Sequence, residues 1–154
     1  MSAPVKVSGD GSSSATLALR AFEEALRCED RDMRADLSLG ANDLSAVRLV
    51  LDRGADGLRP SDLARELGIS SAATTALIDR LERAGFVERS HDAEDRRSVS
   101  VRSTLDADSA IVRAIDRASE RRLRALESLE TGDRAVLARS LNAVTAAISA
   151  EETR

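Results

Sequence analysis

The stretch that decides the fold reads Leu63-Ala64-Arg65-Glu66-Leu67-Gly68-Ile69-Ser70 and continues to Arg102. Its apolar spacing predicts a short helix that ends at Gly68, and Ser70 predicts the N-cap of a second helix running to Ala84. Two strand-like segments, residues 86–89 and 97–102, follow with a charged loop between them. These parts predict a winged helix-turn-helix, which places one helix in the DNA major groove and a wing against the backbone or the minor groove.

Composition supports a fold built mainly from helices. The chain has 154 residues, of which 42% are hydrophobic, and Phe22 and Phe86 are its only aromatic residues. This length fits one compact domain with a sizeable core of aliphatic side chains. Without Trp or Tyr, stacking on single-stranded nucleic acid is disfavoured.

The formal net charge of −4 does not by itself favour DNA, because affinity for DNA comes largely from neutralising phosphates. The acidic excess lies outside the decisive stretch, since residues 58–102 carry eight basic and eight acidic side chains. A basic surface there has to arise from the way the fold sorts these charges.

The flanking segments predict a tail and two sets of helices. Residues 1–14 are rich in Ser and Gly and are expected to be a disordered tail, before a single domain over 15–154. Within that domain we expect the winged helix over about 43–104 and flanking helices over about 15–38 and 106–151, with Asp43 as an N-cap and an interruption at 131–133. The final helix repeats apolar residues at Leu137, Leu141, Val144 and Ile148, which is a seam for another helix and predicts a homodimer.

Short polar residues on the second helix are candidate DNA contacts. They are Ser70, Ser71, Thr74 and Thr75, and they let the helix backbone approach the groove while offering hydroxyl groups. For Ser70 the pattern favours a helix cap over a DNA contact, whereas for Thr75 it favours the DNA contact. The free amides at the start of this helix are a further phosphate site.

The wing offers Arg89 and Arg97 on either side of its loop. Asp95 precedes Arg97 by two residues and could hold its guanidinium at a fixed angle for insertion into a minor groove. The alternative is a solvated loop of balanced charge, and the pattern alone slightly favours that alternative.

Residues from about Asn42 to Thr104 resemble the MarR family of bacterial winged-helix regulators. The similar pieces are Leu63-Ala64-x-x-Leu67-Gly68-Ile69-Ser70, then Thr75-x-x-x-Asp79-Arg80-Leu81-Glu82-x-x-Gly85-Phe86-Val87-Glu88-Arg89, and Asp95-x-Arg97-x-x-x-Val101. The first piece is shared by many helix-turn-helix proteins. The second, joined at this spacing to the Asp-x-Arg wing, is much more specific.

The resemblance implies a ligand-responsive repressor that binds double-stranded DNA at a pseudo-palindromic operator, as a homodimer joined through its terminal helices. By that similarity Thr75 reads the major groove, Arg80 and Arg89 bind phosphates, and Arg97 reaches the minor groove with Asp95 as its support. The family also implies a small aromatic or lipophilic effector, although the sequence has no aromatic cluster to bind one.

Some residues depart from the family pattern and favour a second possible function. Ala76 stands where the family often has a DNA-contacting arginine, and the second helix has little charge before Arg80. Together with the acidic composition, these features fit a winged-helix protein-interaction module with weak or no specific DNA binding. Salt-dependent binding to a palindrome separates the two functions.

The sequence gives little support to redox sensing, metal binding or catalysis. Cys28 is the only cysteine, which favours a reducing, cytoplasmic location, and we interpret it as a half-buried structural residue rather than a redox sensor. One histidine and one cysteine far apart predict neither a metal site nor a cofactor. No nucleophile–base pair or phosphate-binding glycine loop is present in the sequence, so we expect no enzyme activity, and no run of residues predicts a membrane span.

Overall fold

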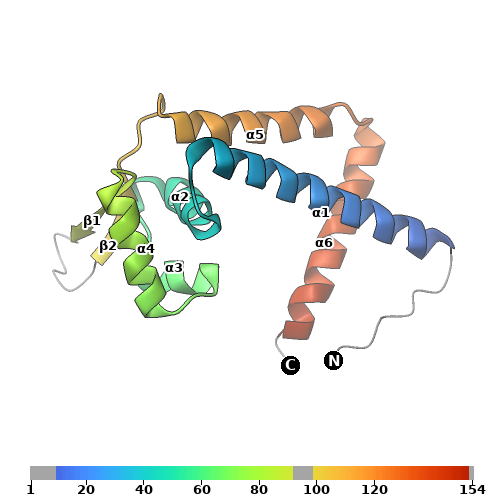
Figure 1. The fold of residues 1–154 in the computed structure, drawn as a ribbon. Coiled ribbons are helices and arrows are strands. Elements are labelled where there is room, and N and C mark those ends of the chain that lie inside the picture. The colour runs from blue at the N-terminus through green and yellow to red at the C-terminus, as the bar shows by residue number, and fades with distance from the viewer. Residues whose placement is uncertain (1–9, 92–98, 153–154) are drawn as a thin grey trace. The chain divides into compact units, whose positions relative to one another are not determined.

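The computed structural model describes residues 10–91 and 99–152, most of which are helical (Figure 1). In chain order the elements are α1 (Asp10–Leu37), α2 (Ala41–Arg53), the 3-10 turn η1 (Gly54–Asp56), α3 (Pro60–Leu67), α4 (Ser71–Arg83), β1 (Val87–His91), β2 (Val99–Ser103), α5 (Ala110–Glu127) and α6 (Thr131–Glu152). The predicted fold class, mainly α with a small β-hairpin, is confirmed. The chain divides into two compact units, Met1–Arg113 and Ala114–Arg154, with the boundary inside α5. That residues 15–154 act as one domain stays a prediction.

Two helix boundaries differ from the sequence-based expectation. Helix α1 begins at Asp10, so residues 10–14 are helical although they were expected in the tail, and residues 1–9 lie outside the described chain. The predicted interruption between the last two helices is present, but it lies at 128–130 rather than at 131–133. Helix α6 already begins at Thr131, and Asp133 lies in its first turn, at the positive end of the helix dipole.

The core of the first unit is formed by α2, α3, α4 and the hairpin. Helix α2 contributes Leu44, Val47 and Val50, and α3 contributes Leu63, all at most 1% exposed. Leu77, Ile78 and Leu81 from α4 and Val87 and Val101 from the strands complete it, as the 3.6-residue and two-residue periods predict. This core fixes α4 against α2 and leaves the opposite face of α4 to solvent.

The wing sheet consists of β1 and β2, paired antiparallel from Val87 opposite Ser103 to His91 opposite Val99. Leu58 forms an isolated bridge to Val101, in which Leu58 N donates to Val101 O at 2.9 Å and Val101 N donates to Leu58 O at 2.8 Å. Leu58 is thus paired with the wing by a single bridge and not by a strand. It attaches the start of α3 to the base of the wing.

Asp43 was expected to be an N-cap, but Gly40 occupies that position and Asp43 is the third residue of α2. The Gly40 amide donates to Asp43 Oδ2 at 2.9 Å, which is the backward bond of a capping box. The Asp43 side chain is only 10% exposed, so its charge needs a partner.

The second unit contains most of α5 and all of α6, and it leaves many apolar side chains in contact with solvent. On α6, Leu141, Val144 and Ile148 are 41%, 43% and 57% exposed, and they follow one another at three- and four-residue steps. On α5, Leu123 and Leu126 are about half exposed. An uncovered stripe of this kind is typical of a helix that packs against a partner.

Gly57 provides a test of the contact between the bridge and the wing. Its φ is +68°, and an added Cβ would lie 2.8 Å from Arg102 Cγ and 2.9 Å from Val101 O. Gly68 has a similar φ of +62° with open space around a Cβ, so Gly68→Ala is the matched control. We expect Gly68→Ala to lower the free energy of unfolding by about 1–2 kcal/mol, the cost of the left-handed conformation alone.

Gly57→Ala should cost more than about 2 kcal/mol, because overlap with backbone adds to that conformational cost. Urea unfolding followed by circular dichroism at one protein concentration measures both losses. Equal losses for the two variants would show that the close approach at Gly57 does not constrain the fold.

Candidate DNA-binding site

The turn between α3 and α4 follows the sequence-based prediction closely. Gly68 takes the left-handed conformation that ends α3, and its amide donates to Arg65 O while the Ile69 amide donates to Ala64 O at 3.1 Å. The Ser70 hydroxyl accepts from the Ala73 amide at 3.2 Å. The cap interpretation of Ser70 is thereby confirmed, and this short turn fixes the angle between the two helices.

Helix α4 presents a smooth surface of small side chains over its first two turns. Ser71, Ala72, Thr75 and Ala76 are exposed there, while Leu77 and Ile78 are buried beneath them. The Thr75 hydroxyl donates to Ser71 O at 3.0 Å, so its oxygen lone pairs remain free to accept hydrogen bonds. No charged side chain stands on these two turns, which span residues 71–77 of the described chain.

The prediction that Thr74 contacts DNA is corrected by its burial. Thr74 is 1% exposed, and its hydroxyl donates to Ser70 O at 2.9 Å. The sequence suggested otherwise because threonine is polar, but a hydroxyl bonded to the carbonyl four residues earlier can be buried at little cost. The neighbouring Ala73 is exposed.

Arg80 is bonded to the buried carboxylate of α2. Its Nε and Nη2 donate to Asp43 Oδ1 at 3.1 and 2.5 Å, and its side chain is 52% exposed. The pair compensates the charge of Asp43 and links the start of α2 to the second half of α4. The exposed half of the guanidinium is still on the surface, where a phosphate contact remains a prediction.

Arg89 connects the wing to α4. Its Nη2 donates to Asp79 Oδ1 at 2.5 Å, its Nη1 donates to Glu82 Oε2, and its backbone amide donates to Glu82 Oε1 at 3.2 Å. The hydrogen bond that Arg89 donates to Asp79, together with the charge of Glu82, raises the pKa of Arg89 above its ordinary value. A group with two carboxylate partners is a positioning residue for the wing, and its predicted phosphate contact would have to compete with both partners.

The tip of the wing, residues 92–98, lies outside the described chain. The predicted minor-groove contact of Arg97 and the supporting role of Asp95 therefore stay predictions. Strands β1 and β2 lead directly into this segment from both sides, as the hairpin prediction requires.

The described residues contain no group of three or more His, Cys, Asp or Glu side chains that could hold a metal ion. Cys28 is half buried as expected, and its sulfur accepts from Arg31 Nη2 at 2.8 Å. No helix within residues 10–91 and 99–152 has both the length and the apolar character that a membrane span requires.

A short helix, a glycine turn, a helix with an exposed small-residue face and a two-stranded wing define this protein as a winged helix-turn-helix protein (Figure 1). Residues 42–99 match the model of the MarR family, which places the similarity on the winged helix. The resemblance seen in the sequence is confirmed.

Curated relatives and solved structures agree with this assignment. The HTH-type transcriptional regulator YfiV of Bacillus subtilis is 44% identical over 75 residues, which are 49% of this chain and 44% of that protein. The HTH-type transcriptional repressor YetL of the same organism is 33% identical over 72 residues, 47% of this chain and 43% of that protein. The chain thus matches less than half the length of these relatives.

Likeness at the level of the fold extends over almost the whole chain. The structure of a MarR family protein from Bacillus stearothermophilus matches with a TM-score of 0.69 and 23% identity, covering 92% of this chain and 99% of that one. The matched structure therefore has counterparts of the flanking helices as well as of the winged helix.

The Asp43–Arg80 pair generates a prediction about stability. In a double-mutant cycle of Asp43→Ala and Arg80→Ala, we expect a coupling energy above about 1 kcal/mol, because a hydrogen-bonded charge at a nearly buried site is worth about 1.5–3 kcal/mol. Glu120 and Arg124, 3.3 Å apart and both more than 60% exposed, form the control pair. Their cycle should give only about 0.3–0.5 kcal/mol.

Chemical unfolding of all variants at one protein concentration gives both coupling energies. If the Asp43–Arg80 coupling were no larger than that of the control pair, the carboxylate would not hold α4 in place.

Proposed function

We propose that this protein is a sequence-specific transcriptional regulator that binds double-stranded DNA with α4 in the major groove. The observation that carries the proposal is the exposed, uncharged surface at the start of α4. Small side chains there allow the helix backbone to come close to the base edges, and the buried Leu77 and Ile78 keep the helix rigid.

The chemistry of this surface also indicates how bases would be read. Thr75 offers a hydroxyl oxygen that can accept from the amino group of adenine or cytosine, and the methyl groups of Ala72 and Ala76 can contact the methyl group of thymine. With no arginine on these two turns, the bidentate arginine–guanine contact is not available to them. We therefore expect recognition of half-sites that contain thymine at the central positions.

Phosphate contacts would fix the protein on the duplex. The candidates are the amides at the start of α4 with Ser70 and Ser71, the exposed half of Arg80, and Arg97 in the wing. Arg89 would contribute chiefly by holding the wing against α4 through Asp79 and Glu82.

A second copy of the chain would cover the apolar residues of the flanking helices. Leu141, Val144 and Ile148 on α6 and Leu17 and Phe22 on α1 are at least 41% exposed. A homodimer would present two α4 helices to half-sites about one helical turn apart, roughly 10 base pairs centre to centre.

Repression follows simply from occupancy of an operator that overlaps a promoter, and the relative YetL is named a repressor. By its resemblance to the family, the protein would respond to a small aromatic or lipophilic effector that changes DNA binding. This role requires no catalytic step and no cofactor, and it places the protein in the cytoplasm with its DNA.

Selection of binding sites from a random duplex pool tests the proposal. We expect a palindromic sequence to be enriched and bound with an affinity that falls as salt rises. Thr75→Val should weaken binding to the selected site by about five- to tenfold, or about 1–1.4 kcal/mol, while Thr131→Val on α6 serves as the matched control and should leave it unchanged.

Binding that is absent, or equally strong to all duplexes, would instead support a winged-helix protein-interaction module. An unchanged affinity of Thr75→Val for the selected site would remove Thr75 from base recognition while leaving the wider proposal intact.

The dimer is tested by light scattering after size exclusion. The protein should have twice the mass of one chain, and the double variant Leu141→Asp/Ile148→Asp should be a monomer because it places charge in the apolar stripe of α6. Asn142→Asp places one negative charge beside the stripe, and this variant should remain a dimer. A monomeric parent protein at all concentrations would overturn the dimer proposal.

A further inference from the structure

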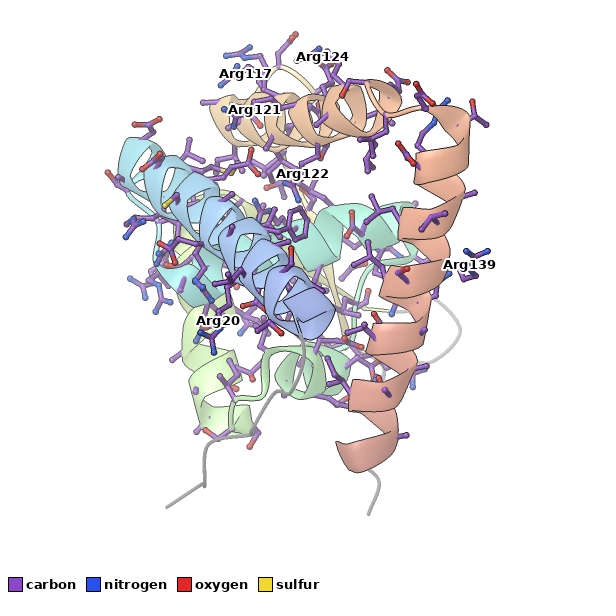
Figure 2. All side chains as sticks on the ribbon, turned by 90° about the vertical axis from the view of Figure 1, so that its right-hand side faces the viewer. Arg20, Arg117, Arg121, Arg122, Arg124 and Arg139 are labelled. Carbon is purple, nitrogen blue, oxygen red and sulfur yellow. The ribbon has the colours of Figure 1, made fainter. Side chains whose placement is uncertain are left out.

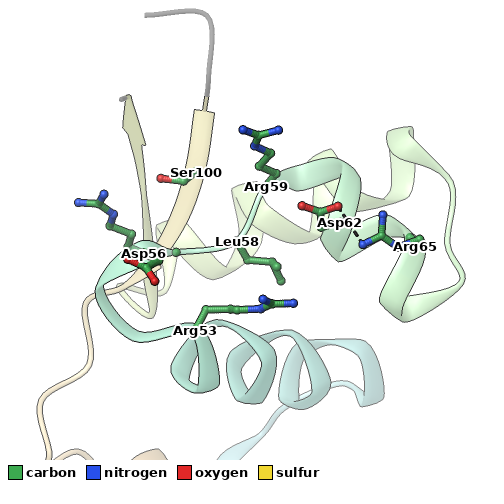
Figure 3. A pocket seen from close by; sticks show the side chains of 9 residues that line it. Arg53, Asp56, Leu58, Arg59, Asp62, Arg65 and Ser100 are labelled. Carbon is green, nitrogen blue, oxygen red and sulfur yellow. Dashed lines mark ion pairs between the residues drawn. The ribbon is translucent and has the colours of Figure 1, made fainter. Parts of the chain in front are cut away.

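A pocket of about 430 Å³ lies on the first unit, apart from the exposed face of α4 (Figure 3). Four segments converge on it: the end of α2, the turn at η1, the start of α3 and strand β2. Its lining residues are Arg53, Asp56, Gly57, Leu58, Arg59, Asp62, Arg65, Ser100 and Arg102.

Backbone hydrogen bonds hold the walls of the pocket in place. The Leu58–Val101 bridge joins the turn to β2 through two bonds of 2.9 and 2.8 Å, and the Gly57 amide donates to Gly54 O at 3.3 Å. Gly57 permits the side chain of Arg102 to pass over the turn, since any Cβ there would lie 2.8 Å from Arg102 Cγ. The shape of the pocket is therefore set largely by the backbone and not by exposed side chains alone.

The charge of the pocket is opposite to that of the whole chain. Four arginines and two aspartates give its lining a formal charge of +2, whereas the chain carries −4. Asp62 is occupied by Arg65, whose Nη2 lies 2.9 Å from Asp62 Oδ1 (Figure 3). Among the described residues, Arg53, Arg59 and Arg102 have no ion-pair partner.

Arg102 gives the most specific evidence that the pocket binds a ligand. Its Nε is buried and has no hydrogen-bond acceptor within the described part of the chain. Buried donors in folded proteins almost always have an acceptor, so an unpartnered one calls for an explanation. An oxyanion in the pocket would supply an acceptor for the guanidinium of Arg102, which lines it.

The start of α3 adds positive potential at the same place. Arg59 is the N-cap residue of α3 but its side chain makes no capping bond, and Pro60 follows at the first helical position. The partial positive charge of the helix end therefore lies beside the pocket without a side-chain cap, and Asp62 in the first turn, which is paired with Arg65, offsets part of it.

From these observations we propose that the pocket binds a phosphate group, with Arg59 and Arg102 as its principal ligands and Arg53 as a further cation. Arginine suits this role because its planar fork donates two bonds to a phosphate. The phosphate could belong to the DNA backbone or to a free phosphorylated small molecule. The DNA backbone is a source because the first helix of a helix-turn-helix crosses it. Only the first source rests on the proposed DNA-binding function.

Titration calorimetry of the full chain with pyrophosphate, at fixed ionic strength, tests the site without DNA. We expect saturable binding that weakens about tenfold or more in Arg59→Ala and in Arg102→Met, which keeps the apolar stem of the side chain over Gly57. Arg139→Ala on α6 is the matched control, since Arg139 also lacks an ion pair among the described residues and projects into solvent (Figure 2). It should bind pyrophosphate like the parent protein, and circular dichroism checks the fold of each variant.

A second arm separates the sources of the phosphate. If the phosphate belongs to DNA, Arg59→Ala should lower the salt slope of binding to a duplex by about 1, and Arg139→Ala should not. If it belongs to a free molecule, pyrophosphate binding is lost in the variants while the salt slope is unchanged. The proposal is overturned if neither pyrophosphate binding nor the salt slope responds to the loss of Arg59 or Arg102. If the protein bound no DNA, the proposed function would be wrong, but the pyrophosphate titration would still test the phosphate site.

Discussion

The carboxylate of Asp43 joins the start of α2 to α4, and the arrangement of the winged helix depends on this link. It accepts the Gly40 amide at the start of α2 and two donors from Arg80 on α4, at 2.9, 3.1 and 2.5 Å. A nearly buried charge has few stable arrangements, because any loss of a donor leaves it unpaired in a region of low polarity. This constraint fixes both the position of α4 along the core and its rotation, and thereby decides which residues of α4 face outward.

The outward face that results is small and uncharged, while two nearby arginines are held by carboxylates. Arg80 is bonded to Asp43, and Arg89 to Asp79 and Glu82. Such pairing reduces the general attraction to phosphates, so the discrimination between DNA sequences has to come largely from close contact with base edges. The arginine pocket beside α3 is the exception, since three of its four arginines have no ion-pair partner among the described residues.

Local features of the winged helix were predictable from the sequence, whereas its long-range pairs were not. Gly68, Ser70 and the buried Leu77 and Leu81 follow from turn, cap and period rules that operate within a few residues. Asp43 and Arg80 are 37 residues apart, and only the fold brings them together. The same holds for Arg59 and Arg102, which line one pocket because Leu58 pairs with Val101. Thr74 was misplaced because its hydroxyl is satisfied within its own helix.

The central claim, that the start of α4 enters the major groove, is tested most directly by amide hydrogen exchange of the full chain with and without a duplex selected by the protein. The account predicts slowed exchange over residues 70–77, and no such change with a scrambled duplex of equal length. Slowed exchange confined to α5 and α6, or none at all in the presence of a bound duplex, would contradict it.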